Sequence, residues 1–328
     1  MKITPEFIVN FETRIQGLVS SSWDRVTSNL SWDRLMKVRQ SQSQKEIITW
    51  LLDSVQLSNQ GNGGSKQFDD LIAHSFEITN EEKGTGLRLF KSEIEDNQMR
   101  DNGGIGALDY AQNWARQAGA AAAYEPQRML VELLKNGETS LGYDGVPFFA
   151  ANHPVTPGLT GGPVYQNIFV GANYNVIGAG VTLEDSQSRF AACIAAVSGQ
   201  KFINGIPRFL VPSIIVTPTA GDYRFRQLVG AKVINATDNM LQGYGFEEPM
   251  RMAELDDAPT HFYIGCQDML SDELGALIYS DREAYAINSY AATSSAELHR
   301  MKQFEWHIDG RDGATYGHPW LLFKFKPA

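Results

Sequence analysis

The chain has little cysteine and no apolar run long enough to cross a membrane. Only Cys193 and Cys266 occur among the 328 residues, both in apolar stretches. Such surroundings are typical of reduced, buried thiols, so we expect no disulfide. The longest apolar stretches, such as residues 209–216, have the length of a strand and fall short of the roughly 18 residues of a membrane span. Polar residues interrupt the first twenty positions, where a signal peptide needs an apolar core, so we expect a cytoplasmic protein without membrane contact.

Basic charge is also scarce. The chain has 28 Lys plus Arg against 38 Asp plus Glu, a formal net charge of −10. Domains that hold nucleic acid tightly usually carry a strongly basic patch, so this composition argues against such a domain. Residues 1–40 are the exception, with six basic and four acidic residues and a local net charge of +2. The length suggests about two domains, and 43% hydrophobic residues are enough for a folded core.

Signatures of catalysis and cofactor binding are absent. Gly61–Ser65 lacks the spacing of a phosphate-binding loop and is predicted to be a loop tip. Gly84-Thr85-Gly86 lacks the third glycine of a dinucleotide fingerprint and is predicted to be a turn. None of the six histidines has a second histidine four residues away, and no Gly-x-Ser-x-Gly elbow occurs. We therefore expect no catalytic residue, no cofactor and no metal site.

Two histidines leave alternatives to weigh. His307 and Asp309 lie on the same face of a predicted strand, with Asp312 close by. They could form a general-base pair or a hydrogen-bonded surface pair, and the missing nucleophile motif favours the surface pair. His153 precedes Pro154 in an irregular stretch, where we predict a buried hydrogen-bonding role.

The first helix is predicted from a start signal and an apolar stripe. Thr4 fits the N-cap position and Pro5 the first helical position. The stripe consists of Phe7, Phe11, Ile15 and Leu18, spaced four, four and three residues apart. Residues 39–45 contain no apolar side chain and are interpreted as a polar tether. The stripe must pack on the rest of the fold or on a neighbouring subunit, so its four residues are candidates for an assembly interface.

Residues 46–98 are predicted to form a long hairpin. Short alternating apolar and polar runs flank a glycine-rich tip at residues 61–65, and Lys83–Gly86 is a predicted turn. An isolated two-stranded ribbon is at best marginally stable in water, so the hairpin should rest on a partner. The candidate interface residues at the tip are Gly61, Gly63, Gly64 and Lys66.

The remaining pattern mixes helices and strands. The strongest helical segment covers residues 107–136 and ends at Gly137, with a kink or break predicted near Pro126. Its small residues at 119–123 either let another backbone pack closely or only reflect high helix propensity. Residues 137–180 are predicted to be irregular. Further helices are predicted at 183–198 and 222–229, and strands at 209–216, 232–235, 261–265, 277–280, 304–309 and 321–325. Such a mixture without regular βαβ alternation indicates an α+β fold.

Several motifs resemble the major head subunit family of Mu-like phages. Leu133-Leu134-Lys135-Asn136-Gly137 is followed by Tyr143-Asp144-Gly145-Val146-Pro147-Phe148-Phe149 and by His153-Pro154-Val155. This order is similar to the family's helix end, Tyr-Asp-Gly turn, Phe pair and His-Pro-Val motif. Weaker resemblances lie at residues 76–79, 90–96, 209–212 and 316–323. The best-matched part is residues 76–155.

The resemblance implies the HK97-like major capsid fold of tailed phages. It assigns residues 1–45 to an N-terminal arm, 46–100 to an extended hairpin (the E-loop), 101–140 to the spine helix of a peripheral domain, 141–272 to an axial domain and 273–328 to strands that return to the peripheral domain. In such a shell the arm and the hairpin lie over adjacent subunits, so we expect their apolar faces to become buried only on assembly.

The function that the resemblance implies is structural. The chain would self-assemble into hexamers and pentamers of an icosahedral shell that encloses double-stranded DNA, and would act with a separate scaffolding protein, a portal and decoration proteins. It would be made and assembled in the cytoplasm of the host bacterium and reside in the virion. A scaffolding segment fused at the N-terminus is not expected. The alternatives are an encapsulin-like cellular compartment of the same fold, or an enzyme with a site near His307 and Asp309.

Overall fold

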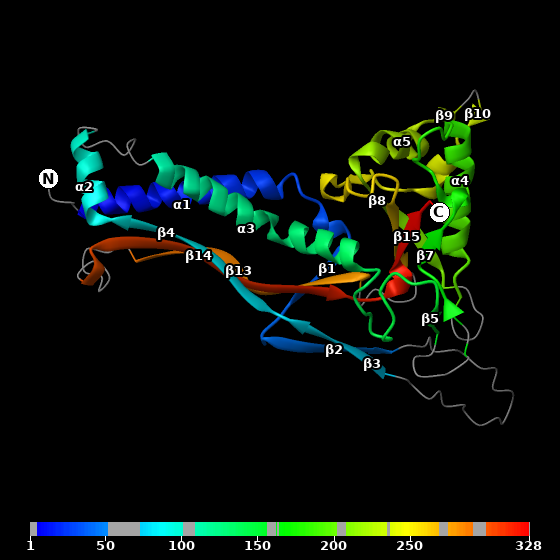
Figure 1. Cartoon of the computed structure of the whole chain (residues 1–328), viewed down its shortest axis with the longest axis horizontal. Helices are drawn as coiled ribbons and strands as arrows, with labels where there is room; N and C mark the ends of the chain where they lie inside the picture. The colour runs from blue at the N-terminus through cyan, green and yellow to red at the C-terminus, as the bar shows by residue number, and fades with distance from the viewer. Residues whose placement is uncertain are drawn as a thin grey trace, which may run out of the picture.

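The computed structural model describes residues 5–51, 73–100, 109–155, 162, 164–201, 208–234, 237–268, 275–290 and 300–327. The chain forms a long, thin lobe with a compact lobe at one end (Figure 1). The long lobe contains the helices α1 (Pro5–Thr27), α2 (Lys91–Arg100) and α3 (Asp109–Asn136). In the described part of the chain, no helix combines the length and the apolar character needed to cross a membrane.

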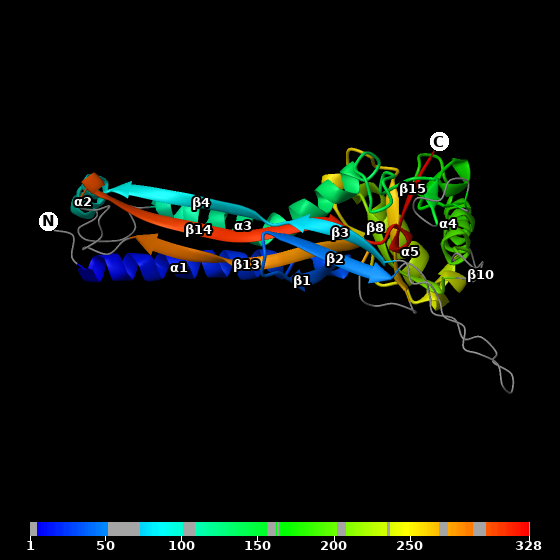
Figure 2. The same ribbon diagram turned by 90° about the horizontal axis from the view of Figure 1, so that it is seen from below.

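A four-stranded sheet runs along the long lobe. Its order is β1-β13-β14-β4, with β1 parallel to β13 and the other neighbours antiparallel. The helices α1 and α3 lie on one side of the sheet, and the strands are visible from below (Figure 2). The strands are β1 (Met36–Gln40), β4 (Glu81–Phe90), β13 (Leu277–Tyr290) and β14 (Gln303–Tyr316). The strands predicted at 277–280 and 304–309 are confirmed but are much longer than predicted, and β1 is not among the predicted strands.

The prediction of a turn at Lys83–Gly86 is wrong, because these residues lie inside β4. Gly84 pairs with Asp309, and Gly86 pairs with His307, on the neighbouring strand β14. A Cβ atom on Gly84 would lie 2.2 Å from Asp309 Oδ1, and one on Gly86 would lie 2.8 Å from His307 Nδ1. The two glycines therefore make room for larger side chains of the adjacent strand and do not reverse the chain.

The predicted long helix is confirmed as α3, and α1 packs on it at close range. A Cβ atom on Gly119 of α3 would lie 2.4 Å from the carbonyl oxygen of Val19 in α1. Of the two readings of the small residues at 119–123, the structure therefore confirms close backbone packing. Pro126 lies inside α3, which continues to Asn136, so the alternative of a break at this position is wrong.

The predicted first helix is confirmed as α1, but its apolar stripe is partly buried within the subunit. Phe11 and Ile15 are 1% and 0% exposed and belong to a core that includes α3 and β14. The expectation that the stripe becomes buried only on assembly is therefore wrong for these two residues. Phe7 and Leu18 are half-buried, and Thr4 lies outside the described residues.

The prediction of a polar tether at residues 39–45 is wrong. The backbone N–H of Ser41 donates to the carbonyl of Asp281, 2.9 Å away, directly after β1. The buried Asn80 donates from its side-chain amide to Ser41 Oγ at 3.0 Å and to the Ser43 carbonyl at 2.8 Å. The polar residues of this stretch are thus hydrogen-bonded to the base of the hairpin and hold it against the sheet.

The prediction of a hairpin is confirmed for residues 45–79 but is wrong for residues 81–98, which lie in β4 and α2 of the long lobe. The arms of the hairpin are β2 (Lys45–Leu51) and β3 (Ala73–Thr79), which pair antiparallel, and the glycine-rich tip lies outside the described residues. One face of the ribbon packs on the long-lobe sheet in a small cluster of Ile48, Phe76, Ile78 and Ile278. The subunit therefore supplies part of the partner that the ribbon needs. Ile47 is 67% exposed.

The compact lobe is built on a five-stranded sheet of order β11-β8-β12-β15-β7. The strands are β7 (Ile168–Val170), β8 (Leu210–Thr217), β11 (Met250–Arg251), β12 (Phe262–Asp268) and β15 (Leu322–Lys326). Helices α4 (Leu183–Ser198) and α5 (Thr219–Gly230) share a core with this sheet. The predicted helix at 183–198 is confirmed with both of its bounds, and a capping box of Thr182 and Asp185 fixes its start.

Short elements complete the fold. The two-stranded ribbons pair β5 (His153–Pro154) with β6 (Val164–Tyr165), and β9 (Val233–Ile234) with β10 (Thr237–Asp238). The 3-10 helices are η1 (Trp32–Arg34), η3 (Ala172–Tyr174), η4 (Met240–Tyr244), η5 (Ala253–Leu255) and η6 (Pro319–Leu321).

The last strand, β15, does not lie where it was expected. Residues 273–328 were all expected in the domain that contains the spine helix, but the strands pair in two different sheets. β13 and β14 lie in the long lobe, whereas β15 lies between β12 and β7 in the compact lobe. Phe323 and Phe325 of β15 are fully buried in the compact core, which explains why this strand leaves the long lobe.

A buried polar node holds the motifs around the Phe pair together. His153 is buried, with Nδ1 2.6 Å from Asp144 Oδ2 and Nε2 3.1 Å from the Phe148 carbonyl. Asn167 donates to the carbonyls of Phe148 and Pro319, at 2.6 and 3.1 Å. The predicted buried hydrogen-bonding role of His153 is confirmed.

Candidate functional site

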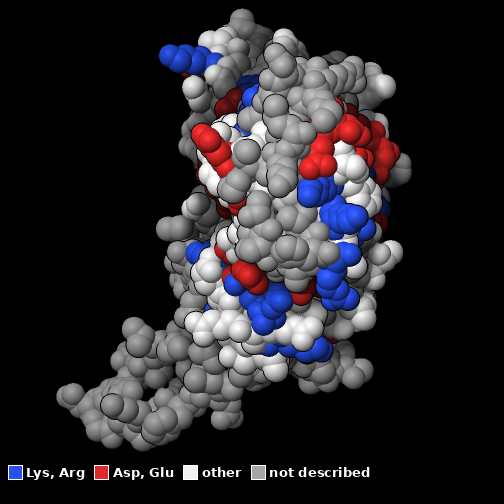
Figure 3. Space-filling model, turned by 90° about the vertical axis from the view of Figure 1, so that its left-hand side faces the viewer, with Lys and Arg blue, Asp and Glu red and all other residues white. Residues whose placement is uncertain are grey.

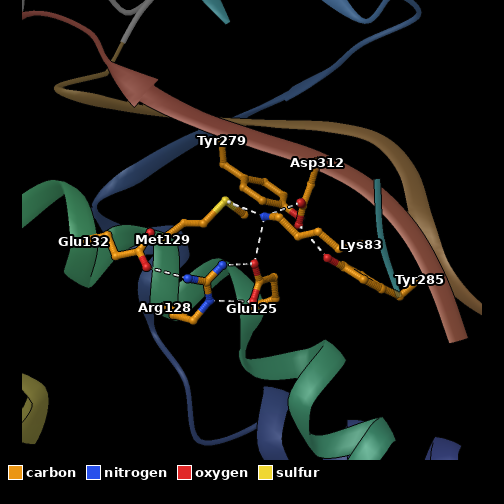
Figure 4. Close-up of polar contacts among 8 residues, drawn as sticks. All are labelled: Lys83, Glu125, Arg128, Met129, Glu132, Tyr279, Tyr285 and Asp312. Carbon is orange, nitrogen blue, oxygen red and sulfur yellow. Dashed lines mark hydrogen bonds and ion pairs between the residues drawn. The ribbon is translucent and has the colours of Figure 1, made fainter. Parts of the chain in front are cut away.

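The long lobe contains a buried ion network between α3 and the sheet (Figure 4). Lys83 of β4 lies 2.8 Å from Asp312 Oδ1 of β14 and 2.7 Å from Glu125 Oε1 of α3. The side chain of Asp312 is 1% exposed, that of Glu125 15% and that of Lys83 22%. One ammonium group therefore joins the helix to two neighbouring strands at a half-buried position.

Further side chains complete the network around both carboxylates. The hydroxyl groups of Tyr279 and Tyr285 donate to Asp312 Oδ2 at 3.1 and 3.2 Å. On the helix side, Arg128 donates from Nε to Glu125 Oε2 at 2.8 Å and also contacts Glu132. The buried Asp312 and the half-buried Glu125 thus each have at least two donors, which offsets the cost of removing them from water.

The network stabilises its own charged state. Burial alone would lower the pKa of Lys83, but its hydrogen bonds to Asp312 and Glu125 outweigh burial and raise the pKa above its ordinary value. Burial alone would raise the pKa of Glu125, but donation by Arg128 and Lys83 outweighs it and lowers the pKa. Burial and then the Asp312 charge raise the pKa of Tyr285. At neutral pH, Lys83 therefore stays an ammonium ion that cannot act as a nucleophile, and the arrangement fits a structural tie.

Two small cavities flank Lys83. One, of about 270 Å³, is lined mainly by polar groups of α3 and the strands, among them Asn136 and Ser140. The other, of about 140 Å³, lies over Ala118 and Ala122 of α3. Among the described residues, no group of three or more His, Cys, Asp or Glu side chains is placed to hold a metal ion.

The structure separates the residues of the enzyme alternative. Asp312 lies on the same buried face of β14 as Phe304, Trp306 and Ile308, and this face packs against α3. His307 lies on the other face, 3.4 Å from Glu305. The three-residue group of His307, Asp309 and Asp312 is therefore not assembled as one site. Alternation along β14 could have placed Asp312 inside, whereas nothing in the sequence pointed to Lys83 or Glu125 as its partners.

The interface candidates divide into three groups. Phe11 and Ile15 are buried in their own subunit, and Phe7 and Leu18 are half-buried. Gly61, Gly63, Gly64 and Lys66 lie outside the described residues. Burial raises the pKa of the Cys193 and Cys266 thiols, so both stay protonated and unreactive at neutral pH.

With this geometry in view, the chain can be compared with known proteins. Residues 13–176, half of the chain, match the Mu-like prophage major head subunit gpT family, and the chain belongs to this family. The major capsid protein of Escherichia phage Mu is 32% identical over 98 residues. That alignment covers 30% of this chain, and the chain spans only 29% of the length of this relative.

Solved structures show the same fold at low sequence identity. The bacteriophage JBD30 capsid structure has a TM-score of 0.54 and 19% identity, covering 69% of this chain and 91% of that chain. The capsid of cyanophage P-SCSP1u also has a TM-score of 0.54, with 12% identity, covering 89% of this chain and 86% of that chain. The fold is therefore the α+β, HK97-like fold of phage capsid proteins, as the resemblance implied.

Proposed function

We propose that the chain is a structural capsid subunit that self-assembles into hexamers and pentamers of an icosahedral shell around double-stranded DNA. The observation that carries this proposal is membership of the major head subunit family by half of the chain. The hairpin β2–β3 runs across the sheet toward the compact lobe (Figure 2), and its exposed face, which includes Ile47, gives a ribbon that can contact a neighbouring subunit.

The parts of the fold suit this role. We assign residues 1–45 to the arm, 46–80 to the extended hairpin, 101–140 to the spine-helix region and 141–272 to the axial domain. The elements β4 and α2, within the expected hairpin range 46–100, are added to the spine-helix region, and β15 is added to the axial domain. Phe7 and Leu18 of the arm and Gly61, Gly63, Gly64 and Lys66 of the hairpin are the proposed contacts with other subunits. The net charge of −10 suits a container that encloses densely packed phosphate without binding it tightly.

The proposed partners are further copies of the chain, a separate scaffolding protein, a portal, decoration proteins and the packaged DNA. Assembly would take place in the cytoplasm of the host bacterium. No catalytic role is proposed, because the buried charged groups of the long lobe satisfy one another.

Electron microscopy of the purified chain, expressed alone and with a scaffolding protein, tests the proposal. We expect closed particles with resolved hexamers. A subunit that remains monomeric under both conditions would contradict it. Neighbouring portal and terminase genes would separate this function from an encapsulin-like compartment, which should instead neighbour a cargo enzyme.

A further inference from the structure

The chain passes between the two lobes at a closely packed joint. Gly317 and His318 lead from β14 in the long lobe to η6 and β15 in the compact lobe. Their N–H groups donate to the carbonyls of Ala276 and Gly275, at 2.7 and 3.1 Å, in the segment directly before β13. A Cβ atom on Gly317 would lie 2.2 Å from the Gly275 carbonyl oxygen, so the two segments touch. We call these four residues the lobe joint.

His318 places a titratable ring inside the protein at this joint. Its imidazole is stacked on the indole of Trp320, with 4.3 Å between the ring centroids and 16° between the planes. The guanidinium carbon of Arg208 lies 4.0 Å from the centroid of the same indole. His318 is 5% exposed, Trp320 4% and Arg208 2%. The imidazole and the guanidinium group therefore pack on one buried ring, where water does not screen them from each other.

Arg208 is the charged group that acts on His318 among the described residues. The other titratable side chains packed around the indole are Tyr143, Asp144, His153 and Tyr165. Burial raises the pKa of the two phenols, so they stay neutral, and the Asp144 carboxylate contacts the His153 ring at 2.6 Å. A proton on His318 would therefore add a second positive charge beside a permanent cation in the interior.

This environment changes how readily His318 takes up a proton. Burial and then the charge of Arg208 lower the pKa of His318 from 6.5 to about 3. An opened joint exposes the ring to water, where its pKa returns to about 6.5. Only the open form binds a proton between these two values, so the equilibrium constant for opening rises about tenfold for each unit by which the pH falls. Acid therefore favours the open joint.

We propose that His318 makes the lobe joint a proton-triggered release between the two lobes. At neutral pH the uncharged ring packs with Trp320 and Arg208 and holds the end of β14 in line with β15. In acid the opened joint keeps the proton, and the hydrogen bonds of Gly317 and His318 to the segment before β13 are lost. The lobes can then change their relative orientation. The release goes beyond the proposed shell function, because it is built into the single subunit.

Hydrogen exchange of the full-length subunit tests the release. After correction for the intrinsic pH dependence of exchange, the amides of Gly317 and His318 should exchange about a hundredfold faster at pH 4.5 than at pH 7.5. His318→Phe keeps a ring to stack on Trp320 but cannot take up a proton, so its exchange should change less than about threefold. His318→Gln is a second variant that cannot titrate. The control, His307→Gln, replaces a partly exposed histidine of the long-lobe sheet and should keep the wild-type response.

Surface carboxylates also take up protons in acid, and the comparison of variants removes their contribution. Figure 3 shows a group of acidic side chains, with basic ones below them, at the end of the long lobe remote from the joint. The wild type and the His318 variants share these groups. An equal acid response in the wild type and in both His318 variants would overturn the release and leave the shell function intact. Acid-induced exchange that is as fast throughout α3 would show global unfolding and would also overturn it.

Titration of the His318 imidazole by NMR gives a second readout. The midpoint in the folded subunit should lie near 3, and Arg208→Met should raise it, because one of the two causes of the low pKa is then removed. Arg208→Lys keeps the charge and should leave the midpoint low. A wild-type midpoint near the ordinary value of about 6.5 would overturn the release, because the closed joint would then bind the proton as readily as the open one.

Discussion

The two lobes bury their polar groups in different ways. The long lobe places formal charges between α3 and the sheet, at Lys83, Glu125 and Asp312. The compact lobe surrounds a core of aromatic rings, such as Phe225 and Phe262 at 4.9 Å between centroids, with the node at His153 and Asn167 nearby. A thin lobe made of one helical layer on one sheet has little apolar depth, so a single ammonium group can join three elements there. The thicker compact lobe relies more on apolar packing, and its buried cations Arg208 and Lys324 lie over aromatic rings, 4.0 Å from the Trp320 centroid and 5.4 Å from the Tyr263 centroid.

The largest expected effect is the loss of the central cation in the long lobe. Lys83→Met leaves Asp312 buried without its ammonium partner and should lower the free energy of unfolding by about 3–5 kcal/mol. The double variant Lys83→Met/Asp312→Asn should recover much of this loss. Lys45→Met, which breaks an exposed pair with Glu77, should cost less than about 1 kcal/mol. Urea denaturation measures all three. Equal effects of Lys83→Met and Lys45→Met would contradict the special role of the network.

In the compact lobe, the corresponding change removes an amide instead of a charge. Asn167→Ala removes the amide that donates to the Phe148 and Pro319 carbonyls and leaves the Ala150 N–H without its acceptor, at a cost of about 1–3 kcal/mol. The exposed neighbouring variant Gln166→Ala should change stability by less than about 0.5 kcal/mol. Thermal unfolding compares the pair. A loss as large as that of Lys83→Met would remove the expected difference between the lobes.

Helix packing in the long lobe gives a smaller effect. Gly119→Ala places a methyl group against the Val19 carbonyl and should cost about 1–3 kcal/mol by forcing α1 away from α3. Gly17→Ala in α1, where no atom lies within 4 Å of the added Cβ, should instead stabilise by about 0.5–1 kcal/mol. Destabilisation by both variants would show that the close approach is not the cause. Denaturant midpoints measure the difference.

The smallest expected effect is a pH dependence of the long lobe. The pKa of Glu125 is lowered in the folded protein, so its contribution is present above the unfolded pKa, about 4.3, and is lost as the pH falls through the folded pKa. Glu125→Gln should therefore flatten the acid side of the stability profile. Glu132→Gln, at a side chain 54% exposed, should change it less. Stability curves at several pH values between 3 and 7 provide the test, and identical acid profiles for the wild type and Glu125→Gln would contradict it.

Local signals predicted the helices better than the sheets. Gly137 marks the real end of α3, because capping is a property of adjacent residues. The sequence patterns did not predict β1 or the full lengths of β13 and β14. In β14 the inward Asp312 interrupts the apolar alternation, and β13 contains register shifts. The ion network needed the pairing of β4 with β14, which are separated by more than two hundred residues, so no local pattern could place Lys83 beside Asp312. Periodicity alone predicted only the α+β class, and the resemblance of residues 133–155 to one family predicted the particular fold.

The position of β14 in the chain has a consequence for biosynthesis. This strand lies between β13 and β4 in the sheet, but β4 ends at Phe90 and β14 begins at Gln303. At about 5–20 residues per second, a ribosome needs roughly 10–40 s to make the 212 residues from 91 to 302. During that time β4 and the apolar side of α1 lack their central strand. A nascent subunit therefore cannot present a finished long lobe to its neighbours until β14 has been made, which delays association of chains that lack this strand.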